Sequence, residues 1–192
     1  MNNSPRILAF AGSARQDSYN KLLVKIAAAG ARASGIEVTE LDLAELPLPI
    51  YDADVERLEG FPANVVRFRE ILQAHQGFLI ASPEYNHFFS PLLKNALDWA
   101  SRPAAGEKVL QAFAGKPAAI MSASNGQYAG VRGLIALRSL LSVLRLIVLP
   151  EVVTIANGAA AFAPNGQLRD ESRQQAAMKL GATLADFLAK IS

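Results

Sequence analysis

Short apolar runs alternate with longer amphipathic segments along the whole chain, and this alternation constrains the fold more than any other feature. Five runs of strand-like character occupy residues 6–11, 37–43, 77–82, 117–122 and 146–149. The first, third and fourth runs are almost entirely apolar, as expected of strands that are covered on both faces. Segments with apolar residues at three- and four-residue steps separate them and predict helices. The alternation therefore predicts right-handed crossovers and a parallel sheet between two helix layers.

The order of the strands follows from their number and composition. The second run keeps Glu37, Glu40 and Asp42, which favours an edge position. We expect helices around residues 22–30, 65–72, 92–100, 134–144 and 176–191, with Ser90-Pro91 as the cap and first-turn proline of the third. Five strands in this pattern indicate an α/β, three-layer α/β/α flavodoxin-like fold with sheet order 2-1-3-4-5, formed by residues 1–192 as a single domain. A ligand of such a sheet binds beyond the carboxyl ends of strands one and three.

The turn after the first strand has the chemistry of a phosphate site. Ser13, Ser18 and Asn20 supply hydroxyl and amide groups, Arg15 supplies a guanidinium, and a helix starts near Ser18. Backbone N–H groups at a helix start and a nearby arginine both favour a bound phosphate. The alternative is a plain helix cap beside a surface arginine. The turn matches neither a dinucleotide glycine fingerprint nor a nucleoside-triphosphate loop.

Two further loops follow the third and fourth strands. Pro83 ends strand pairing, so Glu84, Tyr85, Asn86 and His87 project at the carboxyl edge, where backbone amides and an aromatic side chain can border a flat ring. The alternative is a capped turn that leads to the next helix. Residues 122–130 are mostly small and let the backbone approach a ligand closely, although many strand-to-helix loops share this composition.

Composition excludes several classes of protein. The chain has no cysteine, which excludes disulfides, thiolate catalysis and cysteine-ligated metal or iron–sulfur sites, and which fits a reducing, cytoplasmic location. Nineteen basic and seventeen acidic residues give a net charge of +2, with no basic stripe that would indicate nucleic-acid binding. No apolar stretch is long enough to span a membrane. We expect a protein that acts on small molecules.

The motifs together resemble the NADPH-dependent FMN reductase family, which includes bacterial chromate and quinone reductases and related azoreductases. The resemblance lies in Gly12-Ser13-x-Arg15-x-x-Ser18-x-Asn20, in Pro83-Glu84-Tyr85-Asn86, and in the segment of residues 93–99, Leu-Lys-Asn-Ala-Leu-Asp-Trp. It runs from about residue 6 to residue 151. Many relatives carry two adjacent glycines where this chain has Ala129-Gly130.

This resemblance implies a cofactor, an activity and a set of contacts. FMN would be bound and NADPH, or NADH, would be the electron donor, with ping-pong hydride transfer to the flavin and two-electron reduction of quinones, free flavin, azo compounds or chromate-like oxyanions. A homodimer or homotetramer is also implied. A flavodoxin-like electron carrier or an FMN-binding sensor remains the alternative, although carriers are usually strongly acidic. The implied FMN-binding residues are Ser13, Arg15, Ser18, Tyr19 and Asn20 at the phosphate, Pro83, Glu84, Tyr85 and Asn86 at the isoalloxazine, and Ser122, Ser124 and Gly126 in the rest of the cleft.

Overall fold

The computed structural model describes residues 5–191, so the expected domain limits at residues 1 and 192 lie outside the described residues. Strands and helices alternate through most of this range. The strands are β1 Arg6–Ala11, β2 Glu37–Asp42, β3 Gly77–Ala81, β4 Glu84–Tyr85, β5 Phe88–Phe89, β6 Pro117–Ala123 and β7 Ile147–Ile155. The helices are α1 Tyr19–Ala33, η1 Leu43–Glu45 (a 3₁₀ turn), α2 Ala53–Glu59, α3 Ala63–Gln73, α4 Pro91–Ser101, α5 Val131–Val143, α6 Gly158–Ala161 and α7 Glu171–Ile191.

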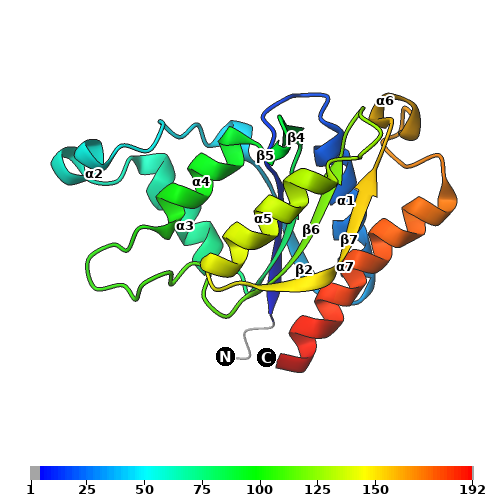
Figure 1. Cartoon of the computed structure of the whole chain (residues 1–192). Helices are drawn as coiled ribbons and strands as arrows, with labels where there is room; N and C mark the ends of the chain where they lie inside the picture. The colour runs from blue at the N-terminus through cyan, green and yellow to red at the C-terminus, as the bar shows by residue number, and fades with distance from the viewer. Residues whose placement is uncertain (1–4, 192) are drawn as a thin grey trace.

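The five long strands form one parallel sheet of order β2-β1-β3-β6-β7, which confirms the predicted flavodoxin-like order (Figure 1). β2, which carries Glu37, Glu40 and Asp42, is an edge strand as its composition predicts. The carboxyl ends of β1 and β3 lie side by side, with Ala11 in register with Ala81. The turns that follow these two strands therefore start next to each other.

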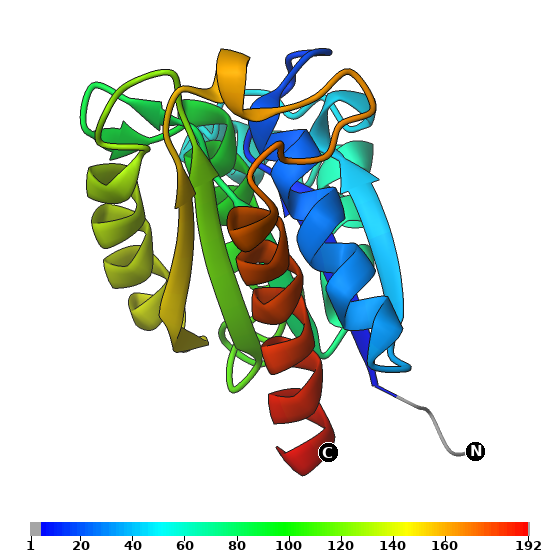
Figure 2. The same cartoon turned by 90° about the vertical axis from the view of Figure 1, so that its right-hand side faces the viewer.

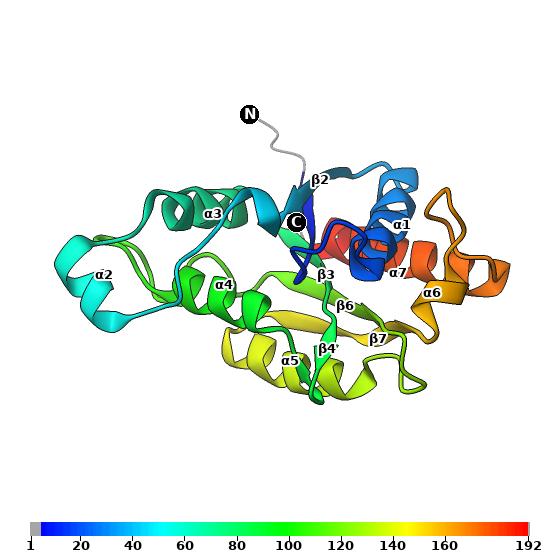
Figure 3. The same cartoon turned by 90° about the horizontal axis from the view of Figure 1, so that it is seen from above.

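Helices cover both faces of the sheet, as the view from above shows (Figure 3). One hydrophobic cluster joins one face of the sheet to α1 and α7, and the other joins the opposite face to α3, α4 and α5. Helices α1 and α7 cross so closely that a Cβ at Gly30 would lie 1.9 Å from the Met178 carbonyl oxygen. α1 is thereby fixed between the sheet and α7. Within residues 5–191, no helix combines the length and apolar character needed to cross a membrane.

The last strand is longer than its sequence pattern predicts. We expected residues 146–149, whereas β7 runs to Ile155. Pro150 and Glu151 fall where the register shifts, because Ala118 pairs with Val148 and Ile120 pairs with Val152. A proline is tolerated here because β7 is an edge strand with a bulge.

The segment between β2 and α2 is tied to α4 by side chains of the 93–99 motif. The Asn95 amide accepts a hydrogen bond from the Tyr51 backbone N–H at 2.8 Å and donates one to the Pro49 carbonyl at 2.8 Å. The buried Trp99 indole N–H also donates to the Pro49 carbonyl at 2.8 Å. These two motif residues therefore anchor a connection, and neither contributes to the cavity described below.

Candidate functional site

The turn after β1 presents hydrogen-bond donors at the start of α1. Ser13 and Ser18 are buried, and both line a cavity. Ser18 is the N-cap residue of α1 but its side chain forms no capping hydrogen bond. Arg15 is exposed, and its guanidinium makes one long contact of 3.5 Å to the Asp17 carbonyl. The first-turn N–H groups of the helix and the guanidinium are thus available to an anion.

Asn20 lines the same cavity and is also bonded to the backbone of β6. It is buried, its Nδ2 donates to the Ala123 carbonyl at 2.9 Å, and its Oδ1 accepts from the Ala123 N–H at 2.9 Å. The reason lies in the sheet, where β3 ends at Ala81, in register with Met121 of β6. Because β6 continues to Ala123, the Ala123 backbone has no strand partner on that side, and Asn20 takes the partner's place.

The turn after β3 is a short hairpin. We expected residues 84–87 to project as a loop, whereas Glu84–Tyr85 pairs with Phe88–Phe89 in an antiparallel ladder. Asn86 and His87 connect the two strands with φ values of 50° and 66°, the sign that a two-residue type I′ turn requires. Asparagine adopts this conformation readily, so the residue that ends the sequence motif also closes the hairpin.

The Glu84 side chain holds the hairpin against α5. Its carboxylate accepts a hydrogen bond from the Gly133 N–H at 2.8 Å. Gly133 belongs to the first turn of α5, where backbone N–H groups favour a negative charge. This hydrogen bond joins the hairpin to the start of α5.

The end of β6 and the loop after it contribute residues with different contacts. Ser122 is fully buried, and its hydroxyl donates to the Ser82 carbonyl at 2.7 Å. Ser124 lines the cavity, and its hydroxyl accepts from the Gly126 N–H at 3.1 Å. The structure thus places Ser122 between strands and Gly126 in a supporting turn, and Ser124 at the cavity wall.

These segments enclose one cavity of about 220 Å³ at the carboxyl end of the sheet. Nine of the residues that sequence reasoning selected line it together, namely Ser13, Arg15, Ser18, Tyr19, Asn20, Pro83, Glu84, Tyr85 and Ser124. Asn86, Ser122 and Gly126 lie outside its lining. Ala123 and Asn125 line it and were not selected, although both fall in the loop of small residues. Neither residue belongs to a sequence motif, so only the small-residue composition of the whole loop could have indicated that they line the cavity.

The cavity suits an anionic group with an attached flat ring. The β1 turn and the start of α1 contribute hydroxyls and Arg15 to its lining, and the hairpin segment contributes Pro83 and the exposed Tyr85. The volume is below the range of about 300–1,000 Å³ typical of sites that enclose a drug-sized ligand. A cofactor-sized molecule would therefore be held by its phosphate end while one ring face stays open to the outside.

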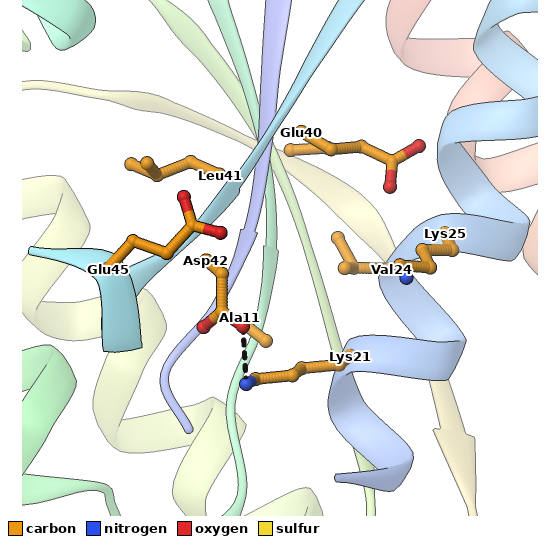
Figure 4. A pocket seen from close by; sticks show the side chains of 9 residues that line it. Ala11, Lys21, Val24, Lys25, Glu40, Leu41, Asp42 and Glu45 are labelled. Carbon is orange, nitrogen blue, oxygen red and sulfur yellow. Dashed lines mark hydrogen bonds and ion pairs between the residues drawn. The ribbon is translucent and has the colours of Figure 1, made fainter. Parts of the chain in front are cut away.

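A second cavity, of about 260 Å³, lies between α1 and β2 and has the wrong charge for a phosphate (Figure 4). It is lined by Lys21, Lys25, Glu40, Asp42 and Glu45 among others. The Lys21 ammonium is already paired with Asp42 at 2.6 Å, as the dashed line in Figure 4 marks. Three carboxylates against two ammonium groups leave an acidic surface.

The two histidines do not form a metal site. His75 is buried at the end of α3, with Nδ1 2.6 Å from the Ile71 carbonyl oxygen and Nε2 2.8 Å from the Thr39 hydroxyl. His87 is exposed at the hairpin tip and accepts a hydrogen bond from Arg132 at 2.7 Å. Across residues 5–191, no group of three or more histidine or acidic side chains is arranged to hold a metal ion.

Comparisons with known proteins agree with the fold and show the family. Residues 5–160 match the family model described as NADPH-dependent FMN reductase. An NAD(P)H-dependent FMN reductase of Pseudomonas aeruginosa is 39% identical over 177 residues, which cover 91% of this chain and 90% of that protein. A quinone reductase of Escherichia coli K12 is 37% identical over 150 residues, covering 78% of this chain and 76% of that protein.

A solved structure extends the likeness beyond the matched family region. The flavoenzyme NAD(P)H:(acceptor) oxidoreductase FerB of Paracoccus denitrificans superimposes with a TM-score of 0.78 at 26% identity, covering 97% of this chain and 98% of that one. The family model, the Pseudomonas aeruginosa relative and the structural neighbour all name flavin-linked reductases that use nicotinamide nucleotides. The chain belongs to the NADPH-dependent FMN reductase family.

Proposed function

We propose that the protein holds FMN in the cavity beyond β1 and β3 and passes electrons from NADPH, or NADH, to small-molecule acceptors. The observation that carries this proposal is the convergence of the β1 turn, the hairpin and the β6 loop on one cavity. Membership of the family supports both FMN and a nicotinamide donor. Quinones and free flavin are the acceptors that the names of its relatives favour. We include azo compounds and chromate-like oxyanions as further acceptors.

The chain's own residues bind and orient the cofactor in this proposal. Ser13, Ser18 and the first-turn N–H groups of α1 hold the phosphate, and Arg15 adds a charge-assisted hydrogen bond. Pro83 and Tyr85 border the ring. When bound, FMN supplies the group that accepts a hydride and gives up two electrons, so no acid, base or nucleophile of the protein is required.

An absorbance spectrum tests the proposal directly. Purified protein, or protein incubated with FMN and desalted, is expected to show flavin bands that NADPH bleaches under anaerobic conditions and that a quinone restores. Colourless protein that takes up no FMN would overturn the proposal. Retained FMN that neither NADPH nor NADH reduces would instead indicate an electron carrier or a sensor.

Replacing Arg15 tests the phosphate end of the site. Arg15→Ala is expected to weaken FMN binding by about 1.5–3 kcal/mol, the value of a hydrogen bond to a charged group, which is roughly 10- to 150-fold in Kd. Affinity for riboflavin, which lacks the phosphate, is expected to stay within about twofold. Arg57→Ala is the matched control, because Arg57 is an exposed arginine on α2 whose partner is Asp54. Wild-type FMN affinity in Arg15→Ala would show that Arg15 does not contact the phosphate.

We propose further that the protein is a cytoplasmic homodimer or homotetramer made of single-domain subunits. Apolar side chains on the hairpin and on α5 support self-association, since Tyr85 is 48% exposed, Phe88 50% and Ile135 67%. Apolar side chains that are exposed as one contiguous patch mark interaction surfaces in soluble proteins. Light scattering on wild type and Ile135→Glu tests this, with a loss of mass expected in the variant. A monomeric wild type would overturn the oligomer.

A further inference from the structure

A segment far along the chain from the predicted site packs against it. Residues 157–168, which we call the brace, follow β7, include α6 and were not selected by sequence reasoning. In Figure 2 the brace is the orange segment that passes above the start of the blue α1. It is hydrogen-bonded to the β6 loop, because the Gly158 N–H donates to the Ser124 carbonyl at 3.0 Å and the Ala159 N–H donates to the Asn125 side chain at 3.0 Å.

The brace also holds the first residue of α1. The rings of Phe162 and Tyr19 are stacked, with centroids 5.8 Å apart and planes 5° from parallel. Next to them, a Cβ added to Gly158 would lie 2.5 Å from Tyr19 Cδ2, so that only glycine leaves room for the ring. Tyr19 is therefore confined by two residues of the brace.

The brace is a closed structure and not a loose loop. Phe162 is buried and pairs with Leu168 in an isolated antiparallel bridge. The Ala163 N–H donates to the Gln167 carbonyl at 2.8 Å, and the Arg169 N–H donates to the Ala161 carbonyl at 2.9 Å. These bonds close the segment on itself. Phe162 thus has a fixed position from which to support the Tyr19 ring.

Tyr19 connects the brace to the phosphate end of the cavity. It lines that cavity and lies in the sequence between the N-cap residue Ser18 and Asn20, whose amide is bonded to Ala123. A change in the orientation of its ring would be transmitted to the backbone of the first helical turn, whose N–H groups face the anion. The contacts of the brace therefore bear on the first turn of α1, whose N–H groups would have to be positioned for the phosphate.

We propose that Phe162 and Gly158 are positioning residues that set the phosphate-binding turn through Tyr19. This inference rests on the proposed function, since it requires FMN to be the ligand. It makes the brace a third supporting element of the cofactor site, besides the sheet and α7. It also predicts that substitutions in the brace affect binding of the phosphate more than binding of the ring.

Titration of FMN and riboflavin into the FMN-free protein, followed by flavin fluorescence, tests the proposal. Phe162→Ala is expected to raise the Kd for FMN by about 3- to 10-fold, the range of one aromatic pair, and to leave the Kd for riboflavin within twofold. Phe162→Tyr is expected to restore FMN affinity. In a Tyr19→Leu background, Phe162→Ala is expected to have little further effect, because its influence passes through the Tyr19 ring.

The control separates positioning from general loss of stability. Phe113→Ala removes a buried phenylalanine that is likewise part of an aromatic pair, with Phe78, but on the opposite face of the sheet. It is expected to lower the Tm without a selective effect on FMN. Should Phe162→Ala fail to fold, Phe162→Leu keeps an apolar side chain and loses only the stacked ring.

Unchanged FMN affinity in Phe162→Ala, or an equal loss for FMN and riboflavin, would overturn the proposal. An additive effect of Phe162→Ala in the Tyr19→Leu background would do the same. These results differ from a failure of the proposed function, in which the wild-type protein itself would bind no FMN.

Discussion

Replacement of Asn20 decides between two roles for this residue, a phosphate ligand or a clamp on the sheet. In the structure both polar atoms of its amide are bonded to Ala123, with two distances of 2.9 Å. Asn20→Ala removes both hydrogen bonds and leaves the buried N–H and carbonyl of Ala123 without their partner. Each such group costs about 1–3 kcal/mol when it is buried and unpaired. For the two groups together we therefore expect the FMN-free protein to lose about 2–6 kcal/mol of unfolding free energy.

Urea unfolding followed by tryptophan fluorescence measures this loss, because Trp99 is the only tryptophan and is buried. With a slope of about 2–3 kcal/mol per molar urea, the midpoint is expected to fall by roughly 1–3 M. Asn64→Ala is the control, since the Asn64 amide makes one hydrogen bond, to the Pro47 carbonyl at 3.0 Å. The control is expected to shift the midpoint by less than about 0.4 M, corresponding to one hydrogen bond near the surface.

Asn20→Asp sharpens the test. The introduced carboxylate still accepts from the Ala123 N–H but places a second acceptor against the Ala123 carbonyl. Folding then favours the protonated carboxyl, so its pKa is raised and the variant regains stability relative to wild type as the pH falls. An FMN-free Asn20→Ala protein as stable as wild type, with weakened FMN binding, would refute the clamp and make Asn20 a ligand.

Two further predictions concern adjacent small residues and acid stability. Gly130→Ala is expected to lower the unfolding free energy in urea by about 3–5 kcal/mol, because φ at Gly130 is 83° and the new methyl group would overlap the Ser122 hydroxyl. Ala129→Gly, at a φ of 52°, is expected to change the unfolding free energy by less than about 1 kcal/mol. Equal effects at the two positions would show that the contact with Ser122 does not matter. Burial lowers the pKa of His75, and a hydrogen bond between its ring and the Ile71 carbonyl opposes this effect. Because the unfolded chain then binds the proton more readily, the protein loses stability as the pH falls through about 6.5. In His75→Gln the urea midpoint is expected to depend less on pH between pH 7 and 5 than in the wild type. The same pH dependence in both proteins would contradict this reasoning.

The strands of the sheet were predictable because burial on both faces leaves a mark in the sequence. Residues 77–82 and 117–122 are continuous apolar runs, and each contains a central strand of the sheet. The extension of β7 was not predictable from the pattern, since Pro150 interrupts the apolar run. Its pairing depends on a bulge that only the neighbouring strand defines.

The site was predictable to the extent that it consists of turns at strand ends. Ser13, Arg15 and Ser18 were selected from their local pattern, and they line one cavity. The role of Asn20 could not be read in this way, because its partner Ala123 lies 103 residues away. Phe162 was missed for the same reason, as nothing near it in the sequence indicates that its ring meets Tyr19.

The close crossing of α1 and α7 has a consequence for the stage of folding at which the protein can bind FMN. Ribosomes synthesise α7 after every other described helix, yet it is the element against which α1 is wedged at Gly30. A chain that lacks α7 lacks the element that packs against α1 at Ala27, Gly30 and Ala31. We therefore expect tight FMN binding only once α7 has packed against α1.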